Sequence, residues 1–184
     1  MDQLHLHCPE ERAETPDAAV RAELTRIGLV VLQEHTLPGV IDVVLTGDEK
    51  LQELNAGFRG IDRPTDVLSF SMTEGQPLMV GENEEDPISG EIYVSLDRAQ
   101  AQAAEINVGV EEELGRLIIH GLLHLAGYDH DTEETLRFME NETERFLDMS
   151  SLAHGTTHIP ADRSCPGGQP HEEGAPPLSW NPRN

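Results

Sequence analysis

The segment of residues 110–127 constrains the fold most, because it predicts a helix that is apolar on nearly every side. Such a helix has to lie inside a larger core. From residue 114 onward, its apolar residues are Leu114, Leu117, Ile118, Ile119, Leu122, Leu123, Leu125 and Ala126. Two histidines, His120 and His124, interrupt them, and burying an imidazole without a partner is costly. The fold therefore has to supply these two histidines with a partner.

The spacing of the histidines predicts that this partner is a metal ion. His120 and His124 are four residues apart, so on a helix they lie on one face, one turn above the other. Gly127 can end the helix in the left-handed conformation, which lets the chain return and present His130 as a third ligand. Three imidazoles and an open fourth position are typical of catalytic zinc, and other divalent transition metals also accept this set. The alternative, in which each histidine only bonds a backbone carbonyl, suits an isolated pair better than this pattern.

The same spacing occurs in the metzincin proteases, which place a glutamate directly after the first histidine as general base. This chain has Gly121 at that position. Peptide hydrolysis needs a proton delivered to a poor leaving amine, whereas RNA cleavage can use a metal-bound water or the RNA's own 2′-hydroxyl. The glycine therefore favours a nuclease, and a metallopeptidase stays an alternative.

The rest of residues 1–150 alternates strand and helix patterns. These patterns predict an α+β (mixed α/β) fold in which a small four-stranded sheet packs with about five helices, with the metal site at the C-terminal end of the buried helix. The expected strands are residues 4–8, 40–45, 67–72 and 90–95. The expected helices are one opened by Thr15 and Pro16, one capped by Asp48, and residues 96–105, 110–127 and 132–150. The acidic segment 73–88 is expected to be a loop, and the order of the strands stays open.

Composition changes near residue 150, and residues 151–184 hold six of the twelve prolines and four glycines with little apolar periodicity. This composition predicts a disordered tail after a single domain of residues 1–150. The two cysteines, Cys8 and Cys165, lie far apart, which excludes a disulfide scaffold and favours a reducing compartment. The sequence shows neither a secretory leader pattern nor an apolar run of about 18 residues, so no contact with a membrane is expected.

The chain carries 35 acidic and 12 basic residues, a formal net charge of −23. Nucleic-acid binding draws on lysine and arginine, so this charge taken alone argues against a nucleic-acid partner. The tail accounts for a net charge of −1, which leaves −22 on residues 1–150. The net charge and the nuclease interpretation of the histidine motif therefore disagree at first sight.

Three sequence blocks together resemble the YbeY family of bacterial metal-dependent endoribonucleases. They are HGLLHLAGYDH at residues 120–130, NAGFR followed by PTDVLSF within residues 55–70, and GEIYVS at residues 90–95. The resemblance covers roughly residues 1–150. It implies a zinc ion held by His120, His124 and His130.

The resemblance also implies a function. The expected protein is a cytoplasmic, single-strand-specific endoribonuclease that acts in 16S rRNA 3′-end maturation and in quality control of the small subunit and the 70S ribosome. Its implied partners are single-stranded rRNA, the small ribosomal subunit and a small-subunit ribosomal protein, and no DNA is expected. A non-enzymatic ribosome-assembly factor that uses zinc only for folding is a further alternative.

Arg59 is the candidate catalytic and substrate-binding arginine, through its match to the NAGFR block and through its chemistry. A guanidinium binds phosphate oxygens in pairs and stabilises the charge that develops during phosphoryl transfer. A surface arginine paired with Asp62 or Asp66 is the alternative. Asp129 is a second catalytic candidate, either as a base or as an acceptor that orients a ligand imidazole, and otherwise it only helps the loop to turn.

Ser69 and Arg116 are candidate substrate-binding residues. Ser69 lies on an expected strand, where it either lines the pocket or only packs. Arg116 lies one helical turn before His120 and either reaches the metal pocket or pairs with nearby glutamates. Net charge is a global average, whereas binding depends on where charges lie. We therefore expect Arg59, Arg63 and Arg116 to form a basic or neutral cleft around the metal.

Overall fold

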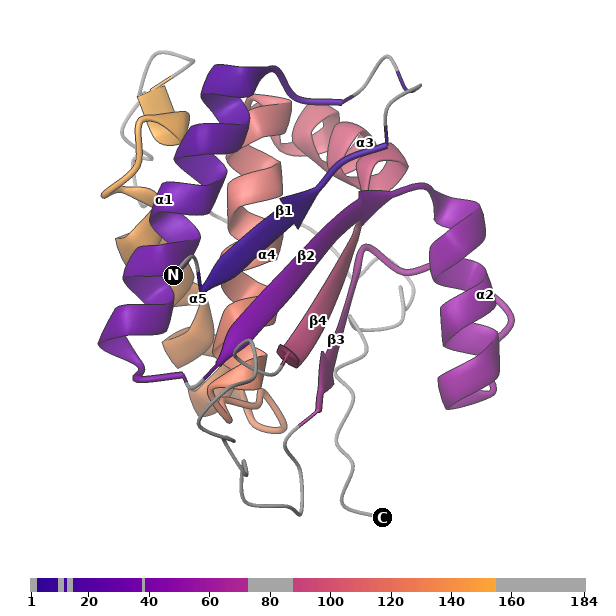
Figure 1. Cartoon of the computed structure of the whole chain (residues 1–184). Helices are drawn as coiled ribbons and strands as arrows, with labels where there is room; N and C mark the ends of the chain where they lie inside the picture. Colours follow the sequence, from indigo (N-terminus) through magenta and orange to yellow (C-terminus); the bar gives the residue numbers. More distant parts are fainter. Residues whose placement is uncertain (1–2, 10–11, 13–14, 38, 73–87, 155–184) are drawn as a thin grey trace, which may run out of the picture.

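The strands of the described chain form one mixed sheet in the order β1-β2-β4-β3 (Figure 1), an order that the sequence pattern does not predict. The computed structural model describes residues 3–9, 12, 15–37, 39–72 and 88–154. β1, β2 and β4 are parallel, and β3 runs antiparallel to β4. The strands are β1 (Leu4–His7), β2 (Val40–Thr46), β3 (Val67–Ser71) and β4 (Ile88–Ser95). The helices are α1 (Ala18–Glu34), α2 (Asp48–Arg59), α3 (Leu96–Ile106), α4 (Val110–Leu125), α5 (Glu133–Leu147) and the short 3-10 helix η1 (Leu152–His154).

Five α-helices in the described part of the chain pack with this sheet, and the expected α+β fold is confirmed. α4 lies at the centre of the packing, because it contacts α1, α3 and α5 as well as β3 and β4. Figure 1 shows α1, α4 and α5 together on one side of the sheet and α2 on the other. The fully buried residues of α4 include Leu114, Ile118, Ile119, Leu122 and Leu123. The prediction of a buried, all-round apolar helix is therefore confirmed.

The first helix begins later than the sequence suggests. The expectation that Thr15 and Pro16 open α1 is wrong, because α1 starts two residues after Pro16 and its N-cap is Asp17. Asp17 Oδ1 accepts from the backbone N–H of Val20 at 2.9 Å, which satisfies one of the donors left open at a helix start. The Thr15 hydroxyl instead donates to the carbonyl of Pro9 at 3.0 Å.

The expectation that Asp48 caps the second helix is also wrong, by one residue. Gly47 is the N-cap, and Asp48 is the first residue of α2. The Asp48 carboxylate accepts from Ser95 Oγ at 2.6 Å, so a tertiary contact at the start of α3 draws it away from its own helix. The Ser95 hydroxyl also accepts from the backbone N–H of Arg98 and thereby caps α3.

The remaining differences from the expected elements lie at their ends. β1 stops at His7 rather than Cys8. β4 begins at Ile88, two residues earlier than expected and at the last residue of the expected loop. α4 ends at Leu125 and α5 at Leu147, each before its expected end.

Two expectations fall on parts of the chain that the structure does not describe. Residues 73–87, most of the expected loop, and residues 155–184, most of the expected tail, lie outside the described residues. The described chain continues past residue 150 into η1, where Leu152 is buried in the same core as α4. Across the described ranges, no helix combines the length and the apolar character of a membrane span.

Candidate metal centre

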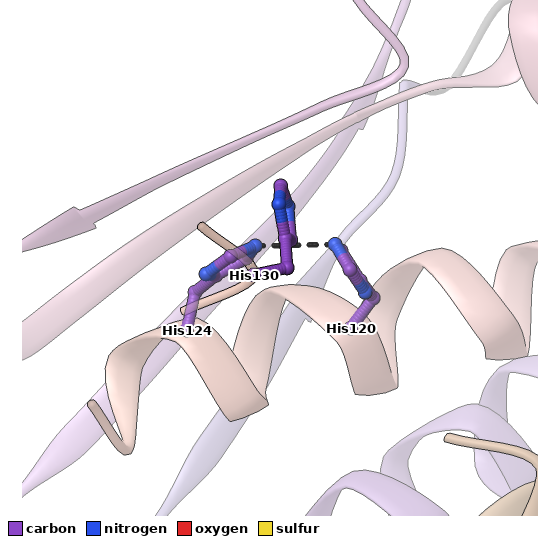
Figure 2. Close-up of side chains that lie close together, drawn as sticks. All are labelled: His120, His124 and His130. Carbon is purple, nitrogen blue, oxygen red and sulfur yellow. Dashed lines mark hydrogen bonds between the residues drawn. The ribbon is translucent and has the colours of Figure 1, made fainter. Parts of the chain in front are cut away.

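Three histidine side chains meet beside the C-terminal half of α4 (Figure 2). His120 and His124 come from α4, and His130 comes from the segment that follows it. Their ring centroids lie 4.7 to 5.6 Å apart, and one ring nitrogen of each lies within 4.8 Å of the others. Nε2 of His120 and Nε2 of His124 face each other at 3.1 Å. The structure thus brings together the three residues that the spacing predicts as ligands, a group called the α4 cluster below.

The turn after α4 returns His130 to the helix. Gly127 takes a φ of 92°, in the left-handed region where other residues meet a Cβ penalty. Its backbone N–H donates to the carbonyl of His124 at 2.9 Å, and the N–H of Tyr128 donates to the carbonyl of Leu123 at 3.1 Å. These bonds satisfy carbonyls that a helix end leaves open. The expected role of Gly127 in ending the helix is confirmed.

The hydrogen bonds of the three histidines fit a metal ion. His124 Nδ1 donates to the Tyr128 carbonyl at 3.0 Å, since a carbonyl can only accept, and Nε2 therefore keeps its lone pair. His130 Nε2 is buried and has no hydrogen-bond partner among the described residues, which is costly for a bare imidazole. The ligand atoms of a tetrahedral zinc ion lie about 3.3 Å apart, close to the 3.1 Å between the two facing Nε2 atoms. The residues present therefore fit an ion of the zinc type.

Burial favours the neutral form of the two imidazoles on α4, His120 and His124. It is the largest cause that lowers the pKa of His120 to about 4, and the charges of His124 and His130 lower it further. The carboxylate of Asp66 acts in the opposite direction. Burial also lowers the pKa of His124. Because only the neutral imidazole binds a metal, the low pKa values keep these ligands competent below the ordinary value of 6.5.

We expect the chelator-treated protein to lose stability as the pH falls from 6.5 to about 4. The unfolded chain takes up a proton on His120 near pH 6.5, whereas the folded chain takes it up only near pH 4, so acid favours unfolding. The loss for this group alone is about 3 kcal/mol. Urea unfolding across this pH range measures the loss, with His120→Asn as the comparison. Parallel pH curves for the two proteins would contradict the expectation.

Arg59 is the last residue of α2, and its charge reaches the α4 cluster. It is among the causes, after burial, that lower the pKa of His124. Burial lowers the pKa of Arg59 itself, so the guanidinium lies partly out of water. A partly desolvated guanidinium beside a metal centre is suited to hold a phosphate group. The sequence candidate Arg59 thus lies close enough to act on the cluster.

Gly121 lies where α4 meets the sheet. A Cβ at this position would lie 2.8 Å from Cγ2 of Ile92 and 3.0 Å from Oγ of Ser69, so a larger side chain requires a shift of the core. The Ser69 hydroxyl donates to the Gly121 carbonyl at 3.2 Å. This contact supports the interpretation of Ser69 as a packing residue. The glutamate of the zinc proteases has no room at this helix–sheet contact.

Arg116 bonds to three carboxylates. Its guanidinium contacts Glu112 and Glu113 of α4 and Glu144 of α5. The side chain of Glu113 is only 6% exposed, and burial raises its pKa despite the guanidinium beside it. The alternative in which Arg116 pairs with nearby glutamates is confirmed. Its charge is therefore neutralised and adds nothing to a basic cleft.

We expect Arg116→Met to destabilise the fold by about 2 kcal/mol, because it leaves the carboxylate of Glu113 buried without its counter-charge. RNA cleavage per folded molecule should stay unchanged. Thermal and urea unfolding measure the first effect. The double variant Arg116→Met/Glu113→Gln should recover much of the loss, since the uncompensated charge is gone. A fall in cleavage without a fall in stability would instead assign Arg116 to the substrate.

Asp129 lies in the turn directly before His130. Its Oδ1 accepts from the backbone N–H of His130 at 2.8 Å, which supports a role in the turn. Its charge also raises the pKa of His124, against the larger effect of burial, so the carboxylate lies near the cluster.

Arg63, another arginine of the expected cleft, is exposed in the segment after α2. Of the three arginines expected to form a cleft, Arg59 is the one whose charge acts on His124.

Sequence reasoning missed two contributors to the cluster. Tyr128 acts through its backbone carbonyl, which any residue type would supply, so no sequence signal marks it. Its ring packs against His35 and Phe138 at centroid distances of 5.2 and 5.4 Å and so supports the turn. Asp66 opposes the lowering of the pKa of His120, an effect that depends on distance across the fold.

The fold and the cluster define an α+β protein with a candidate three-histidine metal centre. A model of the family described as endoribonuclease YbeY matches residues 7–151. Endoribonuclease YbeY of Pelotomaculum thermopropionicum is 39% identical over 138 residues, which cover 74% of this chain and 90% of the relative. Endoribonuclease YbeY of Brevibacillus brevis is 38% identical over 149 residues, which cover 77% and 94%. The solution structure of a Thermotoga maritima protein matches with a TM-score of 0.52 at 30% identity and covers 79% of this chain and 87% of that one.

These matches show that the chain belongs to the endoribonuclease YbeY family. The resemblance stated on the three sequence blocks is confirmed. The family name describes hydrolases that cut RNA, so RNA is the class of partner that it supports. The matched residues 7–151 include Arg59 and all three histidines of the α4 cluster.

Proposed function

We propose that this protein is a zinc-dependent, single-strand-specific endoribonuclease that acts in 16S rRNA 3′-end maturation and in quality control of the small subunit and the 70S ribosome. The observation that carries the proposal is the α4 cluster, in which His130 Nε2 is buried without a partner among the described residues, next to the charge of Arg59. Membership of the YbeY family supports the RNA-cleaving part.

The three histidines would hold the ion through one ring nitrogen each. When bound, an ion of the zinc type supplies a Lewis acid for the scissile phosphate. The carbonyl of Tyr128 holds the proton of His124 on Nδ1, which leaves Nε2 able to bind. The turn at Gly127 keeps His130 against the helix, so the ligand set is assembled before substrate arrives.

Arg59 would bind two phosphate oxygens side by side and offset the negative charge that grows in the transition state. Asp129 would act as the base, because its carboxylate could accept the proton that the attacking oxygen gives up. Its effect on the pKa of His124 supports this role, because it indicates a carboxylate close to the cluster. It would replace the glutamate for which Gly121 leaves no room.

Arg59→Lys is expected to lower the rate of RNA cleavage by about 10- to 100-fold, because an ammonium cannot bind two phosphate oxygens side by side. Zinc binding and thermal stability should stay close to those of the unchanged protein. Cleavage kinetics and zinc analysis on the same preparations measure both. A loss of zinc that parallels the loss of cleavage would mean that Arg59 supports the cluster rather than the substrate.

We infer that the protein works in the cytoplasm on the small ribosomal subunit, with a small-subunit ribosomal protein as a partner. The net charge of −23 supports recruitment by protein contacts, since an acidic protein binds free RNA weakly. In this proposal the nuclease domain, predicted as residues 1–150, extends through η1, because Leu152 lies in its core, and the tail begins after η1.

A cleavage assay with and without a chelator tests the proposal. Its substrates are a labelled single-stranded rRNA fragment and intact small subunits. We expect cleavage that stops with the chelator and returns with zinc. Cleavage of a peptide library that depends on His124 would instead favour the metallopeptidase. Unfolding on chelation, with no cleavage of free RNA or of ribosomes, would favour the non-enzymatic assembly factor.

A further inference from the structure

A second cluster of ligand-type side chains lies on β1 and β2, apart from the α4 cluster. It consists of His5 and His7 of β1 and Asp42 of β2, and its ligand atoms lie within 4.8 Å of one another. His5 and His7 are two residues apart on a strand, so both point to the same face of the sheet. Asp42 is the register partner of His5, so its carboxylate lies on that face too. The alternate residues Leu4 and Leu6 pack in or against the core, which places this cluster on the other face.

Both imidazoles converge on one oxygen of the carboxylate. His5 Nδ1 lies 3.1 Å and His7 Nε2 lies 3.3 Å from Asp42 Oδ1. Ligand atoms around a tetrahedral zinc ion have similar separations of about 3.3 Å. The two imidazoles are 50% and 54% exposed, whereas the side chain of Asp42 is 16% exposed. The carboxylate thus forms the floor of a site that ions can reach from solvent.

The charges of the strands favour a cation at this place. None of the four described strands contains a lysine or an arginine, and Asp42 is paired in register with Glu91 of β4. Glu91 accepts from the hydroxyl of Tyr93 at 3.2 Å. Burial, followed by the charges of Glu91 and Asp42, raises the pKa of Tyr93, so both carboxylates act on the same part of the face. The strands therefore carry negative charge on this face without a strand cation to match it.

We propose that His5, His7 and Asp42 form a second metal site, which takes a divalent transition-metal ion of the zinc, nickel or copper kind. Two imidazoles and one carboxylate are a donor set that such ions accept, with water completing the coordination. Neutral hydrogen bonds from the two imidazoles to the carboxylate are the competing explanation of the geometry. The site uses none of the residues proposed for RNA cleavage, so the two proposals stand or fall separately.

An ion at this site would tie β1 to the rest of the sheet. β1 is a four-residue strand at the edge, and β2 is its neighbour in the sheet. The two histidines belong to β1 and the carboxylate to β2, so the ion cross-links the strands. Because an ion that binds the folded chain stabilises it, zinc should raise the melting temperature through this site as well as through the α4 cluster.

Zinc stoichiometry tests the proposal. The full chain, the variant His5→Thr/His7→Thr and the variant His120→Asn/His124→Asn are dialysed against buffered zinc at about pH 7.5, where histidine is ordinarily neutral. Threonine is used in β1 because it forms strands well. Elemental analysis should find about two zinc ions per unchanged chain and about one in each variant. The same zinc content in the unchanged chain and in His5→Thr/His7→Thr would overturn the proposal.

Two controls separate this site from other sources of zinc. Replacement of His154, His158 and His171 by serine should leave the zinc content unchanged, and a fall to about one ion would assign the second ion to those residues instead. If the variant of the α4 cluster does not fold, NMR of the unchanged chain with Cu²⁺ shows whether an ion binds at the proposed second site. Backbone signals of β1 and of residues 41–43 should broaden, and should not broaden in His5→Thr/His7→Thr. Sharp β1 signals in the unchanged chain would overturn the proposal.

Discussion

His124→Ala should remove zinc from the α4 cluster and lower the rate of RNA cleavage by about 10³-fold or more. His124 supplies the Nε2 atom that faces His120, and the Tyr128 carbonyl holds it in the tautomer that binds a metal. Alanine offers no ligand atom, and two imidazoles hold an ion far less well than three. Elemental analysis and cleavage of a labelled single-stranded RNA measure the two losses. When His124→Ala is made in the His5→Thr/His7→Thr protein, the measured zinc content gives the occupancy of the α4 cluster alone.

The matched control is His7→Thr, which removes an imidazole from the other side of the sheet. Zinc at the α4 cluster and RNA cleavage should both stay unchanged in this variant. His120→Ala should behave like His124→Ala, because its Nε2 faces the same ion position. Far-UV circular dichroism establishes that each variant is folded. Full cleavage by folded His124→Ala would remove the α4 cluster from the mechanism.

Gly121→Ala is expected to destabilise the protein by about 1–3 kcal/mol, although alanine forms helices better than glycine. Its Cβ would lie 2.8 Å from Cγ2 of Ile92, a fully buried β-branched side chain that has little room to move. Gly121→Glu should cost more than about 4 kcal/mol, because it also forces a carboxylate into this contact. Urea unfolding of both variants measures the losses.

Gly57 provides the matched control for Gly121. It lies in α2, it is exposed, and a Cβ there would meet nothing within 4 Å. Gly57→Ala should therefore stabilise the protein by about 0.5–1 kcal/mol, since only helix propensity and chain entropy change. An equal gain from Gly121→Ala would mean that the helix–sheet contact is looser than described. A folded Gly121→Glu protein that cuts peptides would remove the steric argument against a protease.

The ligand positions follow from short-range rules. Helical periodicity alone places His120 and His124 on one face, and the left-handed preference of glycine places the turn that returns His130. Arg116 marks the limit of these rules. Its spacing from His120 is correct for the same face, yet its guanidinium bonds Glu144 of α5, a partner that no local pattern identifies.

The capping residues illustrate the same limit. A threonine before a proline is a good local start for a helix, but the carboxylate of Asp17 reaches the N–H of Val20 and sets the start of α1 instead. Asp48 has the right chemistry for an N-cap, but Ser95 holds its carboxylate from the start of another helix. In both cases several residues compete within one turn, and the folded neighbours decide between them.

By itself the sequence determined a buried helix, two histidines on one face of it, a glycine at its end and a third histidine after the turn. Only the tertiary structure decided the order β1-β2-β4-β3, the reason that position 121 is a glycine and the neutralisation of Arg116. It also decided that His5 and His7 meet Asp42. Periodicity records which residues share a face within one segment, because it follows from the local backbone geometry. It carries no distances between segments, and those arise only when the core packs.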